Sequence, residues 1–357
     1  MTDITEQIAN IQKEIRETPY HKGTEHHIGM LRARIARLKD KVIDSESKKG
    51  GGGGGGYAVK KQGDATIVLV GPPSVGKSTL INSLTNANSK IAPYAFTTVT
   101  VIPGMMEYQN ARIQILDVPG LIEGAEEGKG RGREVISVIR GCDLLLLISE
   151  PGKEKAFDSI LAALERNGIR VNKQKPNIHV IKKIDGGINI YSNLNQELSK
   201  DTIKAVANEM GIKNADIKIK QKVSVDDLID VFSKNRVYTQ ALFVLNKSEQ
   251  QRKIAKENYM YISAQTGKGV DLLLEEVWKR LDFINVYLVK RDEEPSNNAP
   301  IVVKKNITLK EISEKIGEGF AEKIDHAVIW GQGSKFAGQE VSLNTKAVNG
   351  MQVRFVN

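Results

Sequence analysis

The chain has 357 residues, of which 40% are hydrophobic and 27% are charged, and its formal net charge is +9. This length predicts several domains with cores of their own, and the composition excludes a largely disordered protein. A single cysteine, Cys142, excludes disulfide scaffolds and cysteine-rich metal clusters. The basic charge favours an anionic partner such as nucleic acid, although a solvated basic surface fits it equally well. With no hydrophobic signal core and no apolar run of membrane-spanning length, we expect a cytoplasmic protein without a membrane partner.

Two amphipathic helices are expected at the N-terminus. Apolar residues recur at spacings of three and four within residues 4–15 and again within residues 28–42. The interruption at Pro19 and Gly23 is short, which predicts an antiparallel helical hairpin over residues 1–49. The second helix carries several arginines and lysines away from its apolar seam, either as a solvated face or as an RNA-contacting one.

The next segments predict a linker and a nucleotide-binding α/β domain with an insertion. The uninterrupted glycine run at residues 50–56 is expected to be a flexible linker. Over residues 57–171 strand-like apolar runs alternate with helical segments, which predicts a mostly parallel sheet with helices on both faces. Residues 172–236 change to short apolar stretches and two helical segments, typical of a small α+β subdomain. The sheet pattern returns over residues 237–283, so we interpret the subdomain as an insertion.

A small mixed sheet around one helix is expected over the tail, residues 284–357. Thr308 and Glu311 have the spacing of a capping box at the start of that helix. Asn349 and Gly350 form the residue pair typical of a hairpin turn, directly before the last predicted strand.

A complete P-loop, Gly-Pro-Pro-Ser-Val-Gly-Lys-Ser, lies between an apolar strand and a predicted helix. Its glycines let backbone N–H groups face a polyphosphate, while Lys77 can neutralise the β- and γ-phosphates and Ser78 can ligate Mg²⁺. We therefore expect a nucleoside triphosphate as ligand, rather than a chance glycine-rich turn. The residues expected to contact it here are Gly71, Pro72, Ser74, Val75, Gly76, Lys77, Ser78 and Thr79.

A second phosphate-sensing motif, Asp-Val-Pro-Gly, follows another predicted strand. In it Asp117 is expected to hold Mg²⁺ through water, and the N–H of Gly120 to meet the γ-phosphate. Thr98, on the loop between the two motifs, is preferred to Thr97 for completing the Mg²⁺ shell. The glycine-rich segment that begins at Leu121 is expected to order around a triphosphate and loosen around a diphosphate, as a switch rather than a merely flexible loop.

Two further motifs indicate how the base is read. Asn246, Lys247, Ser248 and Glu249 follow one predicted strand, where G-proteins place N-K-x-D. Glu249 keeps the carboxylate that would read guanine but is one methylene longer than aspartate. This favours guanine and leaves adenine open as an alternative. The S-A-x motif that completes the base site after the next predicted strand consists of Ser263, Ala264 and Gln265.

With these motifs the sequence resembles the DRG branch of the Obg-related GTPases over essentially its whole length. The resemblance implies a helical hairpin, a Ras-like P-loop G domain interrupted by an S5D2-like insert, and a C-terminal TGS domain of β-grasp form. It also implies GTP hydrolysis, association with ribosomes or translation, and in eukaryotic members a partner protein of the DFRP kind. Further segments that carry the resemblance are His26-His27-Ile28-Gly29, Phe96-Thr97-Thr98, Gly128-Lys129-Gly130-Arg131-Gly132-Arg133, Lys182-Lys183-Ile184-Asp185, Asp226-Asp227-Leu228 and Asn235-Arg236-Val237-Tyr238.

The sequence departs from the family pattern in two places. Glu249 replaces the expected aspartate, and a related branch with glutamate at this position tolerates adenine, so an ATP-preferring switch stays open. The segment Ser149-Glu150-Pro151 replaces an Asp-rich one, and we expect that change to affect only a loop.

The expected reaction is attack of water on the γ-phosphate, helped by the positive charges of Lys77 and Mg²⁺. Leu121 stands where Ras-like proteins place a water-orienting glutamine, which predicts slow intrinsic turnover. Stimulation is therefore expected from a partner, from the ribosome or from K⁺, although Ser74 replaces the asparagine that related proteins use near K⁺. Arg131 and Arg133 either donate charge to the reaction or belong to a solvated or RNA-facing surface. An RNA-binding scaffold with a structural nucleotide is the alternative to a switch.

Overall fold

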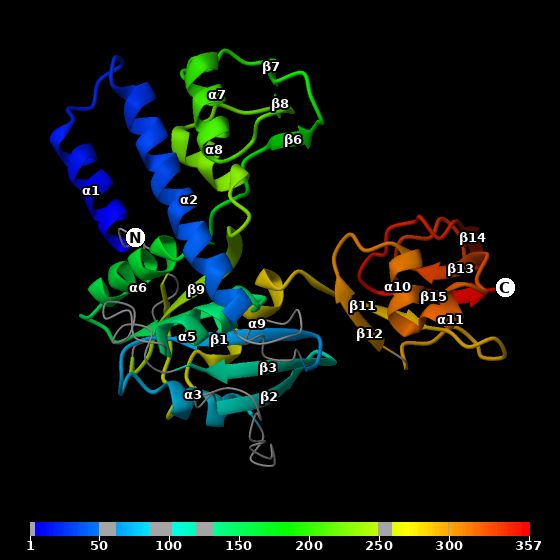
Figure 1. Ribbon diagram of the computed structural model, residues 1–357. Coiled ribbons are helices and arrows are strands. Elements are labelled where there is room, and N and C mark those ends of the chain that lie inside the picture. Colours follow the sequence, from blue (N-terminus) through cyan, green and yellow to red (C-terminus); the bar gives the residue numbers. More distant parts are fainter. Residues whose placement is uncertain (1–3, 50–61, 86–101, 119–130, 249–258, 299) are drawn as a thin grey trace. The chain divides into compact units, whose positions relative to one another are not determined.

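The computed structural model describes residues 4–49, 62–85, 102–118, 131–248, 259–298 and 300–357. They form two compact units, and each unit combines segments that are distant in the sequence. The smaller unit joins residues 1–56 to residues 168–238, and the larger joins residues 57–167 to residues 239–357 (Figure 1). Several predicted features lie outside the described residues, namely the glycine linker 50–56, Thr97, Thr98, Gly120, Leu121 and Glu249.

The larger unit is built on a mostly parallel sheet with the strand order β10-β9-β4-β1-β3-β2. The central strand β1 pairs in parallel with β3 on one side and with β4 on the other. The strands that follow β1 are therefore added first on one side of it and then on the other, which makes β1 a switch point of the sheet. In open α/β sheets, ligands bind at the carboxyl ends of the strands at such a point. The strands are β1 (Ala65–Val70), β2 (Ile102–Tyr108), β3 (Ala111–Asp117), β4 (Leu144–Ser149), β9 (Val237–Leu245) and β10 (Tyr259–Tyr261).

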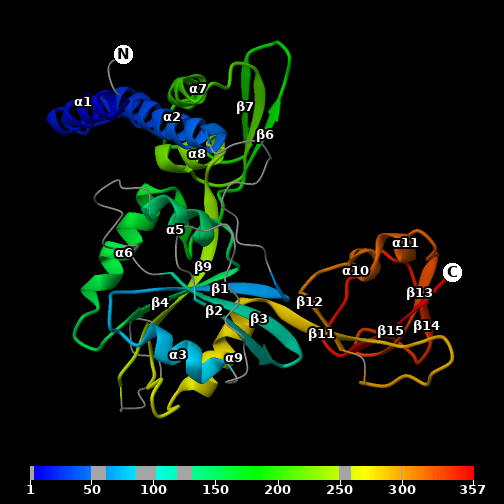
Figure 2. The same ribbon diagram turned by 60° about the horizontal axis from the view of Figure 1, so that its bottom comes forward.

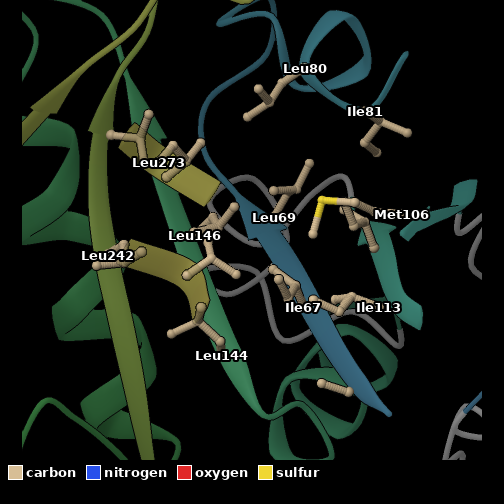
Figure 3. Packing of buried hydrophobic residues seen from close by; sticks show 14 of the residues in the cluster. Ile67, Leu69, Leu80, Ile81, Met106, Ile113, Leu144, Leu146, Leu242 and Leu273 are labelled. Carbon is tan, nitrogen blue, oxygen red and sulfur yellow. The ribbon is translucent and has the colours of Figure 1, made fainter. Parts of the chain in front are cut away.

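Helices cover both faces of this sheet, as the continuous apolar strands predicted. Ile67 and Leu69 of β1 share a core with Leu80 of α3 and Leu273 of α9 (Figure 3). Val68 and Val70 are also buried. Since side chains alternate along a strand, these two face the other side, where α5 and α6 lie opposite α3 and α9 (Figure 2). The helices are α3 (Lys77–Leu84), α5 (Arg131–Arg140), α6 (Lys155–Arg166) and α9 (Val270–Arg280).

A five-stranded mixed sheet follows, with the order β12-β11-β15-β13-β14. The predicted capping box begins its longer helix: the Thr308 hydroxyl accepts from the N–H of Glu311 over 3.2 Å, and the Glu311 carboxylate accepts from the N–H of Thr308 over 2.8 Å. The elements are β11 (Phe283–Leu288), β12 (Pro300–Lys304), α10 (Leu309–Ile316), α11 (Glu318–Ala321), β13 (His326–Gly331), β14 (Gln339–Val341) and β15 (Met351–Val356).

The hairpin predicted at Asn349 and Gly350 is wrong. The last strand, β15, pairs with β13 and β11 rather than with the preceding strand β14. Asn349 instead accepts a hydrogen bond from the backbone N–H of Asn285 over 2.9 Å. The turn thus attaches the end of the connection between β14 and β15 to β11. The turn residues alone could not show which strand pairs with β15.

The smaller unit contains two N-terminal helices, α1 and α2, which contact each other, and a three-stranded sheet with the order β6-β8-β7. Ala33 and Ala36 of α2 share a core with Val206 of α7 and Leu228 of α8. These small residues let α2 approach the other helices closely. The elements are α1 (Ile4–Glu17), α2 (Glu25–Lys49), β5 (Ile169–Val171), which pairs with β9, β6 (Ile178–Lys182), β7 (Ile188–Ser192), α7 (Lys200–Glu209), β8 (Ala215–Ile219) and α8 (Val225–Phe232).

Arginines of α2 are bound by acceptors of the inserted segment, which neither interpretation of this basic face anticipated. Arg34 donates to the Glu209 carboxylate over 3.0 Å, and Arg37 donates to the Glu209 carbonyl oxygen over 3.1 Å. Arg32 lies 3.4 Å from the carboxylate of Asp226. These contacts use part of the positive charge of α2 inside the protein.

A largely buried ionic network lies in the same unit. Asp230 accepts two hydrogen bonds of 2.6 Å from Arg170 and one of 2.8 Å from Arg236. Asp40 of α2 accepts from the hydroxyl of Ser233 over 2.6 Å and lies 3.6 Å from Arg236. The network therefore connects α2 to segments that follow it by more than a hundred residues.

Candidate nucleotide site

The P-loop connects β1 to α3 at the switch point of the sheet, and its backbone is tightly enclosed. A Cβ atom at Gly71 would lie 2.2 Å from the carbonyl oxygen of Ile148, so only glycine fits. Ser74 has a φ of 62° and Gly76 a φ of 87°, both in the left-handed region. The loop thus bends back at two points, as a cradle of backbone N–H groups requires.

Lys77 is held over the loop. Its side-chain nitrogen donates to the carbonyl oxygens of Gly71 and Pro72, each over 3.0 Å. Lys77 is almost fully buried, with 9% of its surface exposed. The ammonium is therefore positioned directly beside the backbone of the loop.

Asp117 and Ser78 form the most informative pair of the site. The Ser78 hydroxyl donates to Oδ2 of Asp117 over 3.2 Å, whereas Oδ1 is buried and makes no hydrogen bond with a described residue. Burial raises the pKa of Asp117, although the charge of Lys77 and the bond from Ser78 act in the opposite direction. A buried carboxylate oxygen without a donor, next to a hydroxyl, fits a hard divalent cation such as Mg²⁺.

Asn246 joins three segments at the predicted base site. Its amide nitrogen donates to the carbonyl oxygen of Val75 over 2.8 Å, and its amide oxygen accepts from the N–H of Ala264 over 2.9 Å. Only 2% of Asn246 is exposed. The end of β9, the P-loop and the segment after β10 are thereby held in one arrangement.

Lys247 is fixed by a residue that the sequence did not single out for the site. Its ammonium donates to the carbonyl oxygen of Ser74 over 2.6 Å and to the carboxylate of Glu150. Glu150 also accepts from Lys153, and the hydrogen bonds from Lys153 and Lys247 lower the pKa of Glu150 to about 2. The expectation that the change at Glu150 affects only a loop is therefore wrong, because the carboxylate contacts Lys247 of the predicted base-reading motif.

The structure brings together most of the predicted site residues that it describes. Ser263 and Ala264 are buried beside Asn246, whereas Thr79 and Gln265 have exposed side chains. Thr98, Gly120 and Glu249 lie outside the described residues, so their roles stay predictions. The signal that could have found Glu150 is its place at the carboxyl end of β4, next to the central strand.

Comparison with known proteins identifies the family. Residues 66–183 match a family described as 50S ribosome-binding GTPase, and residues 185–283 match the C-terminal region of that domain. Over 97% of its length the chain is 41% identical to an uncharacterized GTP-binding protein of Methanocaldococcus jannaschii, covering 91% of that protein. It is 41% identical to developmentally-regulated GTP-binding protein 1 of Xenopus laevis, with 96% and 95% of the two chains covered. The chain belongs to the DRG family of GTP-binding proteins.

The human relative, developmentally-regulated GTP-binding protein 2, is 38% identical, and the match covers 95% of each chain. The resemblance to the DRG branch is therefore confirmed, and the larger unit has the Ras-like P-loop GTPase fold. In the described part of this DRG-family chain, no helix is long and apolar enough to cross a membrane.

Proposed function

We propose that the chain binds GTP and hydrolyses it to GDP as a Mg²⁺-dependent molecular switch. The observation that carries this proposal is the pair Ser78 and Asp117 beside Lys77, in which Oδ1 of Asp117 is buried without a donor from the described residues. A hydroxyl, a carboxylate and an ammonium at the carboxyl end of the central strand suit a metal-bound triphosphate.

Each of these residues has a defined part in the proposed reaction. Water attacks the γ-phosphorus, and the bond to the bridging oxygen breaks, so that GDP leaves with that oxygen. Ser78 would hold Mg²⁺ directly and Asp117 through water, and the ion supplies positive charge at the phosphate oxygens when bound. Lys77 would exchange its loop carbonyl partners for phosphate oxygens. Thr98 would complete the metal shell, and the N–H of Gly120 would meet the γ-phosphate.

Slow intrinsic turnover is part of the proposal, because Leu121 cannot orient the attacking water. A partner, the ribosome or K⁺ would then stimulate hydrolysis, and equal rates in K⁺ and Na⁺ would remove the cation from this set. We also propose association with ribosomes or RNA and with a DFRP-like partner, on the basis of the resemblance to the DRG branch. A cytoplasmic location is proposed because the sequence has no hydrophobic signal core. In the same way, residues 172–236 are proposed to be an S5D2-like insert and residues 284–357 a TGS domain.

Base preference provides the decisive test. GDP and ADP binding are measured side by side on the nucleotide-free protein with Mg²⁺, and then on Glu249→Asp. We expect a GDP preference of at least about tenfold, since a site with fixed polar groups rejects the wrong base strongly. Comparable or tighter ADP binding would overturn the guanine assignment in favour of an ATP-preferring switch. Restoration of guanine preference by aspartate would then identify Glu249 as the cause.

A further inference from the structure

A groove on the smaller unit has a composition suited to a polyanion. It has a volume of about 980 Å³ and lies where β7 and β8 end and α7 begins. In Figure 1 these three elements are adjacent in the green part of the chain. Lys200, Lys218 and Lys220 line the groove, and no aspartate or glutamate is found among its described lining residues. The charged side chains among its described lining residues are therefore all lysines.

The acid nearest along β8, Asp216, is paired mainly with residues outside the groove. Its carboxylate lies 2.7 Å from the ammonium of Lys183 and accepts from the amide of Asn189 over 3.1 Å. Its hydrogen bonds with these two partners lower the pKa of Asp216 most, and the charge of the groove residue Lys218 lowers it further. Lys200 and Lys220 are not among the charges that act on Asp216.

Exposed apolar surface accompanies this charge. Tyr191 is 52% exposed and Leu194 is 44% exposed, and both line the groove. Across the sheet, Lys218 stands opposite Tyr191 on one side and opposite His179 on the other. An aromatic ring, an ammonium and an imidazole therefore form one row that continues the groove over the sheet.

The lining also offers polar groups that suit base edges. Asn193 and Asn195 follow β7 and line the groove with their neighbours. By contrast, the amide of Gln196 is used internally, since it donates to Ser192 and to the carbonyl oxygen of Gln221, over 2.9 Å each. Asparagine amides can both donate to and accept from unpaired bases.

We infer that this groove binds single-stranded RNA, with a base stacked on Tyr191 and phosphates neutralised by Lys200, Lys218 and Lys220. Single strands are favoured over duplexes because a stacking ring needs an unpaired base. Positive charge without acids, together with an exposed ring and free amides, argues against an apolar peptide as the occupant. The inference rests on the proposed RNA association and gives it a location, but it does not depend on GTP hydrolysis.

The test uses the full chain, GDP and a fluorescent 12-nucleotide single-stranded RNA, with binding followed by anisotropy at several salt concentrations. Tyr191→Ala is expected to weaken binding about tenfold, because base stacking is lost. Lys218→Gln combined with Lys220→Gln is expected to weaken binding and to reduce the slope of log K against log salt by about 1.4, or about 0.7 per phosphate contact. Thermal stability should stay unchanged.

The control for Tyr191→Ala is Tyr20→Ala, which removes an aromatic residue that is 67% exposed in the same unit. The control for the lysine variant is Lys204→Gln combined with Lys213→Gln, which removes two exposed lysines outside the groove. We expect both to bind RNA like the parent. The inference would be overturned if the chain did not bind the RNA, or if the groove variants bound it like the parent. It would also be overturned if the control variants lost as much affinity as the groove variants. Equal affinity for duplex RNA or for anionic lipid vesicles would overturn it as well. GDP affinity, measured on the same samples, tests the GTPase proposal separately.

Discussion

The side-chain amide of Asn246 donates to the carbonyl oxygen of Val75 over 2.8 Å, so the end of β9 is bonded directly to the middle of the P-loop. The next residue, Gly76, lies against the same amide, because a Cβ atom there would be 2.4 Å from Nδ2 of Asn246. The segments that we propose to bind the phosphates and to read the base thus share a single contact. A disturbance at either residue should affect the whole nucleotide.

Gly76→Ala should lower GDP affinity by at least about tenfold, since the methyl group would displace Asn246 from Val75. The control is Gly211→Ala, where φ is 84° but nothing lies within 4 Å. That change carries only the cost of a left-handed residue, about 1–2 kcal/mol of stability. Calorimetric titration with GDP would contradict this account if the two variants had equal affinities.

Asp117→Asn should raise the melting temperature of the nucleotide-free, Mg²⁺-free protein at pH 7. Burial raises the pKa of Asp117 from its ordinary value of 3.8, so the ionised carboxylate destabilises the fold. Relative to the variant, the wild type is most stable below pH 3.8, where its carboxyl group is protonated. This relative stability is lost as the pH rises through the raised pKa of Asp117. The advantage of asparagine should therefore shrink on acidification.

The same variant should respond differently to the metal, because an amide is a weaker ligand for Mg²⁺ than a carboxylate. Adding Mg²⁺ should tighten nucleotide binding to the wild type and have little effect on Asp117→Asn. Equal Mg²⁺ enhancement in both proteins would remove Asp117 from the metal site.

Glu150→Gln should weaken GDP binding about threefold to tenfold at pH 7, because Lys247 loses the carboxylate that orients it. The pKa of Glu150 is lowered from 4.5 to about 2, so its stabilising effect is complete above pH 4.5 and is lost as the pH falls toward 2. Melting curves of the two proteins should therefore differ most near neutrality and converge below pH 4.5. Glu107→Gln, which removes an exposed carboxylate 3.9 Å from Arg112, is the control and should leave GDP binding unchanged.

Asp230→Asn should destabilise the smaller unit by about 3–5 kcal/mol, because two largely buried guanidinium groups lose their carboxylate. Asp226→Asn, four residues earlier on α8, is the matched control, since that side chain is 67% exposed. Its loss should cost less than about 1 kcal/mol. Urea unfolding, followed for each transition separately, would refute the importance of the network if both variants unfolded alike.

Elements with a strong local signal could be predicted from the sequence. The strand-like apolar runs expected over residues 57–171 include β1, β3 and β4, and the two helical segments expected within residues 172–236 are α7 and α8. The edge strand β2 was not predicted, because its sequence mixes Pro103, Gly104 and Glu107 with apolar residues. An antiparallel edge needs no continuous apolar run, so this strand carries little signal of its own.

Relationships between distant segments were less predictable. The motifs identified Lys77, Ser78 and Asp117, because the residue types and spacing within each motif are enough to indicate phosphate or metal binding. The contact of Glu150 with Lys247 depends on which strands are neighbours, and the packing of α2 against α7 depends on residues far apart in the chain. Local periodicity identified the apolar face of α2 but could not identify what covers it.

The smaller unit is built from two segments that are distant in the sequence, so it can complete its fold only after the second segment has been synthesised. Ala33 and Ala36 of α2 need α7 and α8 to bury them, yet the whole first part of the sheet domain is synthesised in between. At about 5–20 residues per second, the apolar face of α2 waits on the order of ten seconds or longer for its partners. During that interval the apolar face of α2 can associate with other apolar surfaces, so early chaperone contact would protect this segment.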